Sequence, residues 1–172
     1  MRFASLPLPR RSLLAALGAA LLGGCGFALR QPPAMAFSTI YVAASPGSPM
    51  ALDIRRGLAA LGSVQVIADP ALQQQAQVIL ELVSEQREKV VVGVNSAGQV
   101  REFQLRVRLK FRLRTPAAKE LIAETELVQQ REISFNETAV LAKEAEEGLL
   151  YRAMQADIVQ QLVRRIAAVK SL

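Results

Sequence analysis

Residues 100–114 carry the clearest pattern of hydrophobic and polar positions in the chain. From Phe103 to Leu113 every odd position is apolar, whereas the even positions from Gln104 to Arg114 are polar or charged. Alternate side chains of a β-strand leave opposite faces, so this period of two predicts a strand with one buried face. The other face carries five cations in a row, which repel one another unless neighbouring strands supply carboxylates.

The segments on either side supply these carboxylates and predict a three-stranded meander with the basic strand in the middle. Residues 115–119 are typical of a turn. Folding a strand over residues 121–133 back about residue 117 gives three cross-strand pairs: Glu120 opposite Arg114, Glu124 opposite Lys110 and Glu126 opposite Arg108. Exposed pairs of this kind contribute only about 0.2–1 kcal/mol each, so they select the register more than they stabilise the fold.

The strand before the basic one is predicted over residues 78–94 and is joined to it by a turn signal at residues 95–98. This hairpin brings Glu85 near Arg108 and Glu81 near Arg112. The parity of the register then places four apolar residues of the first strand on the core face, with Leu105 and Phe111 of the second: Leu80, Leu82, Val90 and Val92.

The turn end of this hairpin is predicted to be positively charged. Only two carboxylates lie nearby, Glu88 and Glu102, and Glu88 is expected to point to the other face. Each cation is either part of an anion-binding surface or a solvated charge at a strand end. Four cations are expected to gather here: Arg87, Lys89, Arg101 and Arg106.

The rest of the chain predicts one more strand, over residues 37–43, and two helices. Ser48 followed by Pro49 is typical of a helix start, and residues 64–67 fit either a short strand or an extended link. Asn136 is predicted to cap a second helix that runs to about Val169. The fold class is therefore α+β, a four-stranded mostly antiparallel sheet with two helices packed on one face. The second helix has an apolar stripe that is expected to face the core: Tyr151, Met154, Ile158, Leu162 and Ile166.

The first 24 residues are typical of an export signal. Arginines precede an apolar run over residues 13–22, which is too short to span a bilayer. The run ends in Leu-Gly-Gly-Cys, which resembles a bacterial lipobox and contains the only cysteine, Cys25. We expect residues 1–24 to be a lipoprotein signal peptide, residues 25–36 a lipidated tether and residues 37–172 one periplasmic domain. The alternative is a buried free cysteine after an ordinary signal, and Arg10-Arg11 leaves the general and twin-arginine export routes open.

Composition argues against most other classes of protein. The chain has no histidine, its one cysteine lies in the lipobox, and no phosphate-binding loop or metal-ligand spacing is present. We therefore expect no enzyme and no cofactor apart from a covalent lipid on Cys25, although a hydrolase that uses only carboxylates stays open. Without residues 1–24 the chain has 18 basic and 15 acidic residues. This modest charge, the export signal and the predicted ion pairs argue against nucleic-acid binding.

Cys25 is followed by Gly-Phe-Ala-Leu-Arg, and this motif together with the order of elements resembles the LPS-assembly lipoproteins of the LptE family. The similarity continues at residues 98–104 and 141–162. It implies an outer-membrane lipoprotein that plugs the lumen of the LptD β-barrel, assists its assembly and binds lipopolysaccharide during delivery to the outer leaflet. Gly26 after the cysteine, in place of Asp, favours the outer membrane by analogy with lipoprotein sorting. The alternative is a generic outer-membrane lipoprotein with another assembly or cell-wall partner.

The resemblance also implies lipopolysaccharide-binding residues. The family's basic position at the start of the second helix matches Lys143, but Ser96 stands where the family has a basic residue before the hairpin glycine. We hypothesise that Arg101, Lys89 or Arg87 substitutes for it, with Arg106 at the same end of the hairpin.

Overall fold

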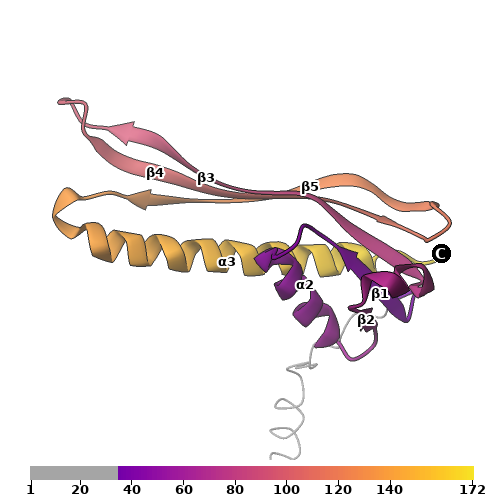
Figure 1. The fold of residues 1–172 in the computed structure, drawn as a ribbon. Coiled ribbons are helices and arrows are strands. Elements are labelled where there is room, and N and C mark those ends of the chain that lie inside the picture. Colours follow the sequence, from indigo (N-terminus) through magenta and orange to yellow (C-terminus); the bar gives the residue numbers. More distant parts are fainter. Residues whose placement is uncertain (1–34) are drawn as a thin grey trace, which may run out of the picture. The chain divides into compact units, whose positions relative to one another are not determined.

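The computed structural model describes residues 35–172, all of which belong to the unit that spans Pro32–Leu172. The predicted signal peptide, Cys25 and most of the predicted tether lie outside the described residues. The main elements are strands β1 (Thr39–Ala43), β2 (Gln65–Ile67), β3 (Val78–Val94), β4 (Val100–Arg114) and β5 (Glu120–Ser134), and helices α2 (Pro49–Ala59) and α3 (Val140–Ala167). Short 3-10 helices cover Pro70–Gln75 and Glu137–Ala139. In Figure 1 the long helix α3 runs beneath the long strands.

The sheet has five strands in the order β2-β1-β3-β4-β5, one more than predicted. Strand β1 is parallel to both β2 and β3, whereas β3, β4 and β5 form the predicted antiparallel meander. The prediction of four mostly antiparallel strands is therefore wrong in detail, and the sheet is mixed. The reason is that β2 has only three residues, too few to show an alternating pattern, and it is held in place by the parallel register Thr39↔Gln65.

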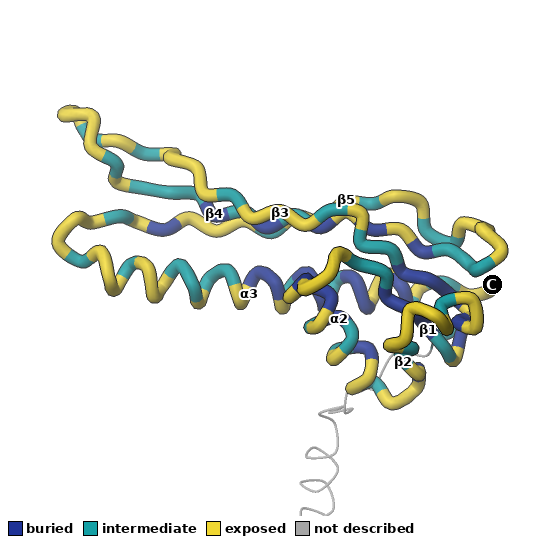
Figure 2. Tube along the Cα trace, in the orientation of Figure 1, coloured by how far each residue is buried: buried dark blue, intermediate teal, exposed yellow. Residues whose placement is uncertain are grey.

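The core lies between one face of the sheet and both helices. Odd-numbered residues of β4 from Leu105 to Leu113 are no more than 1% exposed. They share one apolar cluster with Ile54 of α2 and Ile158 of α3, which confirms that both helices cover the same face. Fully burying one such side chain stabilises the fold by about 1.5–3 kcal/mol. Figure 2 shows that the buried positions of α3 lie in its second half.

The helix starts follow the predicted chemistry with one difference. The Ser48 hydroxyl accepts a hydrogen bond from the Ala51 amide at 2.9 Å, which caps α2 as expected. The Asn136 side chain accepts from the Thr138 amide at 3.0 Å, so it caps the 3-10 turn that leads into α3 rather than α3 itself. The predicted stripe of α3 faces the core, and Met154 and Ile158 are fully buried.

A β-bulge at Val83 changes the predicted register of β3. Leu82 pairs with Phe111 and Ser84 with Lys110, so Val83 is an extra residue on β3. Glu81 lies opposite Arg112 as predicted, but from Ser84 to Val91 the side chains of β3 lie on the face opposite to the predicted one, and a second irregularity follows at Val92. Leu80 and Leu82 therefore face the core as predicted, whereas Val90 and Val92 do not and are 45% and 47% exposed. For the same reason Glu85 pairs with Leu109 and not with Arg108.

Strand β5 carries two irregularities near its start, and their effects on the register add up. Glu120 lies opposite Arg114 as predicted. After the shifts between Phe111 and Arg114, however, Lys110 lies opposite Glu126 instead of Glu124, and Arg108 lies opposite Val128. A slip of two residues preserves which side chains face the core, so Glu126 stays on the open face although its partner changes.

Strand β3 has a free edge over most of its length. Strand β1 pairs only with its first residues, from Val78 to Glu81. The remainder of β3 is bonded on one side, to β4. Four valines close to the turn of this hairpin are at least 45% exposed: Val90, Val91, Val92 and Val94.

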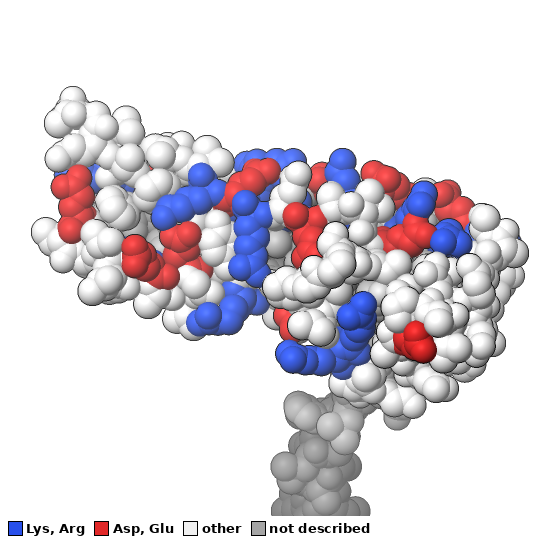
Figure 3. Space-filling view, viewed as in Figure 1, with Lys and Arg blue, Asp and Glu red and all other residues white. Residues whose placement is uncertain are grey.

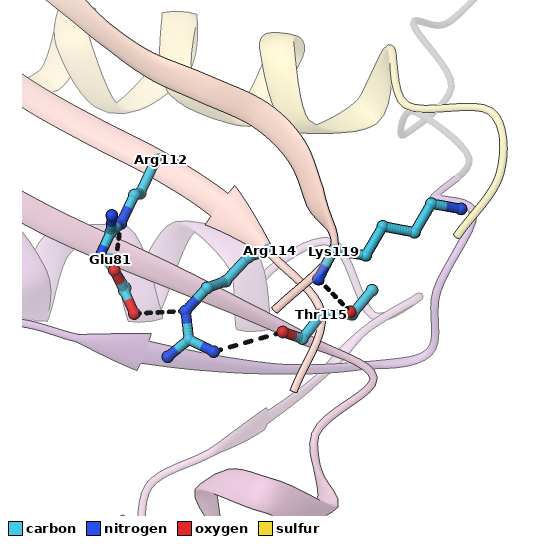
Figure 4. A network of polar contacts seen from close by, with 5 residues as sticks. All are labelled: Glu81, Arg112, Arg114, Thr115 and Lys119. Carbon is cyan, nitrogen blue, oxygen red and sulfur yellow. Dashed lines mark hydrogen bonds and ion pairs between the residues drawn. The ribbon is translucent and has the colours of Figure 1, made fainter. Parts of the chain in front are cut away.

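At the opposite end of the hairpin, Glu81 holds two arginines of β4 (Figure 4). Its carboxylate accepts a hydrogen bond from Arg112 and another from Arg114 Nε at 2.6 Å. Partial burial alone would raise the pKa of Glu81, but the hydrogen bonds and positive charges of Arg114 and Arg112 outweigh it and hold the pKa below the ordinary value of 4.5. This pair of contacts fixes the register of β3 on β4 before the bulge.

Replacing Glu81 by Gln is expected to destabilise the fold by about 1–2 kcal/mol at neutral pH, because two charge-assisted hydrogen bonds are lost from a partly solvated site. A lowered carboxyl pKa gives stability that is present above its ordinary value of 4.5 and is lost as the pH falls through the folded pKa. Urea unfolding of both proteins at about pH 7 and about pH 3 should therefore show a difference that shrinks in acid. Glu124→Gln, at an exposed position on β5, is the matched control, and an equal loss there would contradict this role for Glu81.

Candidate functional site

The β-bulge turns Arg87 and Lys89 toward α3. Their partners in β4 are Val107 and Leu105, which belong to the buried face. Lys89 Nζ lies 2.6 Å from Glu147 Oε2 of α3 and 4.4 Å from the centre of the Phe103 ring. A cation that close to an aromatic face gains a further favourable contact.

Lys143 lies at the start of α3 and faces the same region. Its Nζ donates to Ser134 Oγ at 3.0 Å and to Glu146 Oε2 at 2.9 Å. Lys143 and Lys89 both line a cavity of about 230 Å³, which we call the two-lysine pocket. Its other lining residues come from β4, the end of β5 and the first turns of α3: Phe103, Ile133, Ser134, Phe135, Val140, Glu144 and Glu147.

The walls of the two-lysine pocket are largely apolar. Phe103 and Phe135 pack edge to face with ring centres 5.3 Å apart. The Phe135 amide donates to the Arg101 carbonyl at 2.7 Å, which fixes the chain where β5 ends and turns toward α3. Two ammonium groups above apolar walls form a site that suits a molecule with both anionic and hydrocarbon parts.

Arg87 lies outside this pocket and has a structural partner. Its guanidinium donates to Gln155 Oε1 and lies 5.6 Å from the centre of the Tyr151 ring. Gln155 is only 5% exposed and donates in turn to Asp53 Oδ2 at 2.6 Å. This chain of polar contacts joins β3, α3 and α2.

Tyr151 fixes a second point on the same strand. Its hydroxyl donates to the Glu88 carbonyl at 2.8 Å. Burial raises the pKa of Tyr151, and the nearby Glu147 carboxylate raises it further. The hydroxyl therefore keeps its proton at neutral pH and remains a hydrogen-bond donor.

Arg106 and Arg101 do not join the lysines, so the expectation of one cluster of four cations is wrong. Arg106 lies on the open face of the sheet, where it contacts Glu88 Oε2 at 3.2 Å and Gln104 Oε1 at 2.6 Å. Glu88 was expected on the other face and changed sides with the bulge. Arg101 is exposed near the hairpin turn and donates to Gln99 Oε1 at 3.2 Å. Figure 3 shows cations and carboxylates interspersed on the face drawn.

One break in the alternation of hydrophobic and polar residues marks the bulge in the sequence. Leu80-Glu81-Leu82 alternates, and Val83 then follows Leu82 directly, which breaks the period of two. The glutamates that pair with the two lysines, Glu147 and Glu146, lie in the first two turns of α3, where the helix dipole favours carboxylates.

Within residues 35–172, no group of three or more Cys, Asp or Glu side chains is placed to hold a metal ion. In the same part of the chain, every helix is too short or too polar to cross a membrane.

Solved structures that share this fold include bacterial lipoproteins. An uncharacterized lipoprotein B from Nitrosomonas europaea, solved by NMR, superposes with a TM-score of 0.72 at 32% identity, covering 83% of this chain and 91% of that chain. The rare lipoprotein B from Shewanella oneidensis shares the fold with a TM-score of 0.63 at 20% identity, covering 76% and 95%. The fold therefore defines the class of protein as a bacterial lipoprotein domain.

The family described as "LptE: Lipopolysaccharide-assembly" matches residues 37–166, and the chain belongs to this family. The LPS-assembly lipoprotein LptE of Pectobacterium atrosepticum is 27% identical over 161 residues, which cover 92% of this chain and 85% of that protein. The protein of the same name from Yersinia enterocolitica is 28% identical over 164 residues, covering 92% and 77%. Membership confirms the resemblance found in the sequence and identifies a lipopolysaccharide-assembly lipoprotein. It supports a role in lipopolysaccharide transport rather than catalysis, and a periplasmic, outer-membrane-associated location.

Replacing Gln155 by Leu is expected to destabilise the fold by about 1–3 kcal/mol, because Asp53 and Arg87 lose a buried hydrogen-bond partner while the side-chain volume changes little. Urea unfolding followed by circular dichroism measures the difference. The matched control is Gln160→Leu, at an exposed position of the same helix, which should change stability far less. Equal effects at both positions would show that the polar chain through Gln155 has no special role.

Proposed function

We propose that this protein is a lipid-anchored plug of the LptD β-barrel, which assists assembly of the barrel and binds lipopolysaccharide on its way to the outer leaflet. The observation that carries the proposal is the two-lysine pocket, in a chain that belongs to a lipopolysaccharide-assembly family. The anchor would be lipid on Cys25, which lies outside the described residues. Because several acyl chains hold a protein at a membrane more firmly than one, lipidation would keep it there stably.

The pocket suits the chemistry of the lipid A part of lipopolysaccharide, which combines phosphate groups with acyl chains. Lys89 and Lys143 can donate charge-assisted hydrogen bonds to phosphate oxygens. Phe103, Phe135 and Val140 offer an apolar wall for the adjoining hydrocarbon. With about 230 Å³ the cavity accommodates only part of such a ligand, so the remainder would lie across the surface around it. Arg101 and Arg87 are proposed as secondary contacts, the first near the hairpin turn and the second further along β3.

The open face of the sheet supports the plug proposal. Four of the five β4 cations on this face are paired with carboxylates of β3: Arg106 and Arg108 with Glu88, and Arg112 and Arg114 with Glu81. A hydrophilic, charge-paired face is compatible with the polar, water-filled interior of a large β-barrel. The opposite face is covered by the two helices and is not available for this contact.

The barrel partner is tested by purifying the tagged, lipidated protein from detergent-extracted outer membranes. We expect one large β-barrel protein to accompany it in near-equal amount. Recovery of the lipoprotein alone, together with normal lipopolysaccharide at the surface of cells that lack it, would favour a generic outer-membrane lipoprotein with another assembly or cell-wall partner.

Replacing Lys89 and Lys143 together by Gln is expected to weaken binding of lipopolysaccharide by about tenfold or more, since two charge-assisted hydrogen bonds are lost. Affinity is measured by calorimetry with the detergent-solubilised protein. Two controls accompany it: Lys119→Gln, at the exposed β4–β5 turn, and Arg106→Gln, on the opposite face of the sheet. Both control variants should bind lipopolysaccharide with nearly the affinity of the unchanged protein. If Arg106→Gln weakens binding as much as the double replacement, the ligand lies on the open face.

A further inference from the structure

Both lysines of the pocket are already paired with carboxylates of α3. Lys89 is paired with Glu147 at 2.6 Å, and Lys143 with Glu146 at 2.9 Å. The two glutamates are neighbours in sequence, near the start of the helix. Glu147 lines the pocket and Glu146 does not. A third glutamate, Glu144, lines it but makes no ion pair within residues 35–172. Two cations and two carboxylates line the pocket, so its lining has no excess of positive charge in this state.

A phosphate group would need the same ammonium protons. Lys143 already donates to Ser134 and Glu146, so two of its three protons are engaged. The Lys89 ammonium is bounded by Glu147 and by the face of Phe103. A phosphate that approaches either lysine must therefore displace the glutamate or remain beside it, and two anions in contact repel each other.

We propose that Glu146 and Glu147 act as internal competitors that occupy the lysines until a phosphate group of lipopolysaccharide replaces them. The inference rests on the proposed function of the pocket. It explains how a transport protein can release its ligand: when the phosphate leaves, a carboxylate on the same helix takes its place. The two lysines then keep an anionic partner in both states.

The exposure of these pairs makes the exchange feasible. The side chains of Lys89 and Glu147 are 37% and 22% exposed, and those of Lys143 and Glu146 are 23% and 49% exposed. Ion pairs in such positions are screened by water and are weak, so a ligand that brings further apolar contacts can displace them. The exposed Glu146 side chain can move into solvent when it is displaced. Glu147 is more enclosed, so we expect it to be the stronger competitor.

The test replaces each glutamate by Gln in the full-length, lipidated protein in detergent, and measures binding of bisphosphorylated lipid A. Glu147→Gln is expected to bind roughly two- to fivefold tighter, the factor that corresponds to a weak ion pair, and Glu146→Gln should show a smaller gain. Lipid A without phosphates should show no gain. Circular dichroism confirms that each variant is folded.

Two controls separate competition from a general change in charge. Glu144→Gln removes the same charge from the same pocket but breaks no ion pair, so it should change affinity less than Glu147→Gln. In a protein that already carries Lys89→Gln, the gain from Glu147→Gln should vanish. An equal gain from Glu144→Gln, or a gain that persists without Lys89, would overturn the inference.

Other outcomes also decide the question. Weaker binding by Glu147→Gln would mean that the carboxylate orients the lysine for the ligand, which contradicts competition. A gain seen with inorganic phosphate but not with lipid A would mean that the site takes a free anion, and would also overturn the inference. If the unchanged protein does not bind lipid A, or if the double lysine replacement binds normally, the proposed function of the pocket fails. If the lysine replacements weaken binding of lipid A and the glutamate replacements leave it unchanged, the proposed function of the pocket stands and only the competition is overturned.

Discussion

One extra residue in β3 determines which side chains face α3. Up to Leu82 the strand follows a plain antiparallel register with β4, and the Val83 bulge then exchanges the two faces of the residues from Ser84 to Val91. Without it, Lys89 would lie on the open face beside the cations of β4. With it, Lys89 meets Glu147 and Phe103, and Arg87 meets Gln155. The two-lysine pocket and the polar connection between the three elements both depend on this local irregularity.

The elements with long, uninterrupted periods could be predicted from the sequence. Strands β3 and β4 have the predicted bounds, and β5 extends one residue beyond its prediction at each end. The stripe of α3 was also predicted, because each of these segments repeats its pattern over many residues. The features that were missed are short or local: three residues of β2 show no period, and a bulge needs only one residue to reverse a face. Arg87, Glu88 and Lys89 were assigned to the wrong faces for that reason alone.

The candidate site was only partly predictable, for a related physical reason. Lys143 was predicted from the resemblance to a family. Lys89 was predicted because cations outnumber carboxylates near the hairpin turn. Their proximity depends on how the end of β5 leads into α3, which the Phe135 contact to the Arg101 carbonyl helps to fix. Such tertiary contacts leave no periodic trace in a sequence. The buried Gln155 is a further example, since an amide within an apolar stripe gives no indication of its partners until the fold brings Asp53 and Arg87 to it.

The free edge of β3 has a consequence for how this protein must be handled in the cell. Charged residues such as Glu124 and Glu132 interrupt β5, the other long edge strand, and charges of this kind discourage edge-to-edge association of chains. The outer part of β3 has instead a run of exposed valines whose backbone groups are unpaired on one side. Segments of this composition are templates for the growth of ordered aggregates. Chains that leave this edge uncovered would therefore be prone to associate with one another through it as their concentration rises.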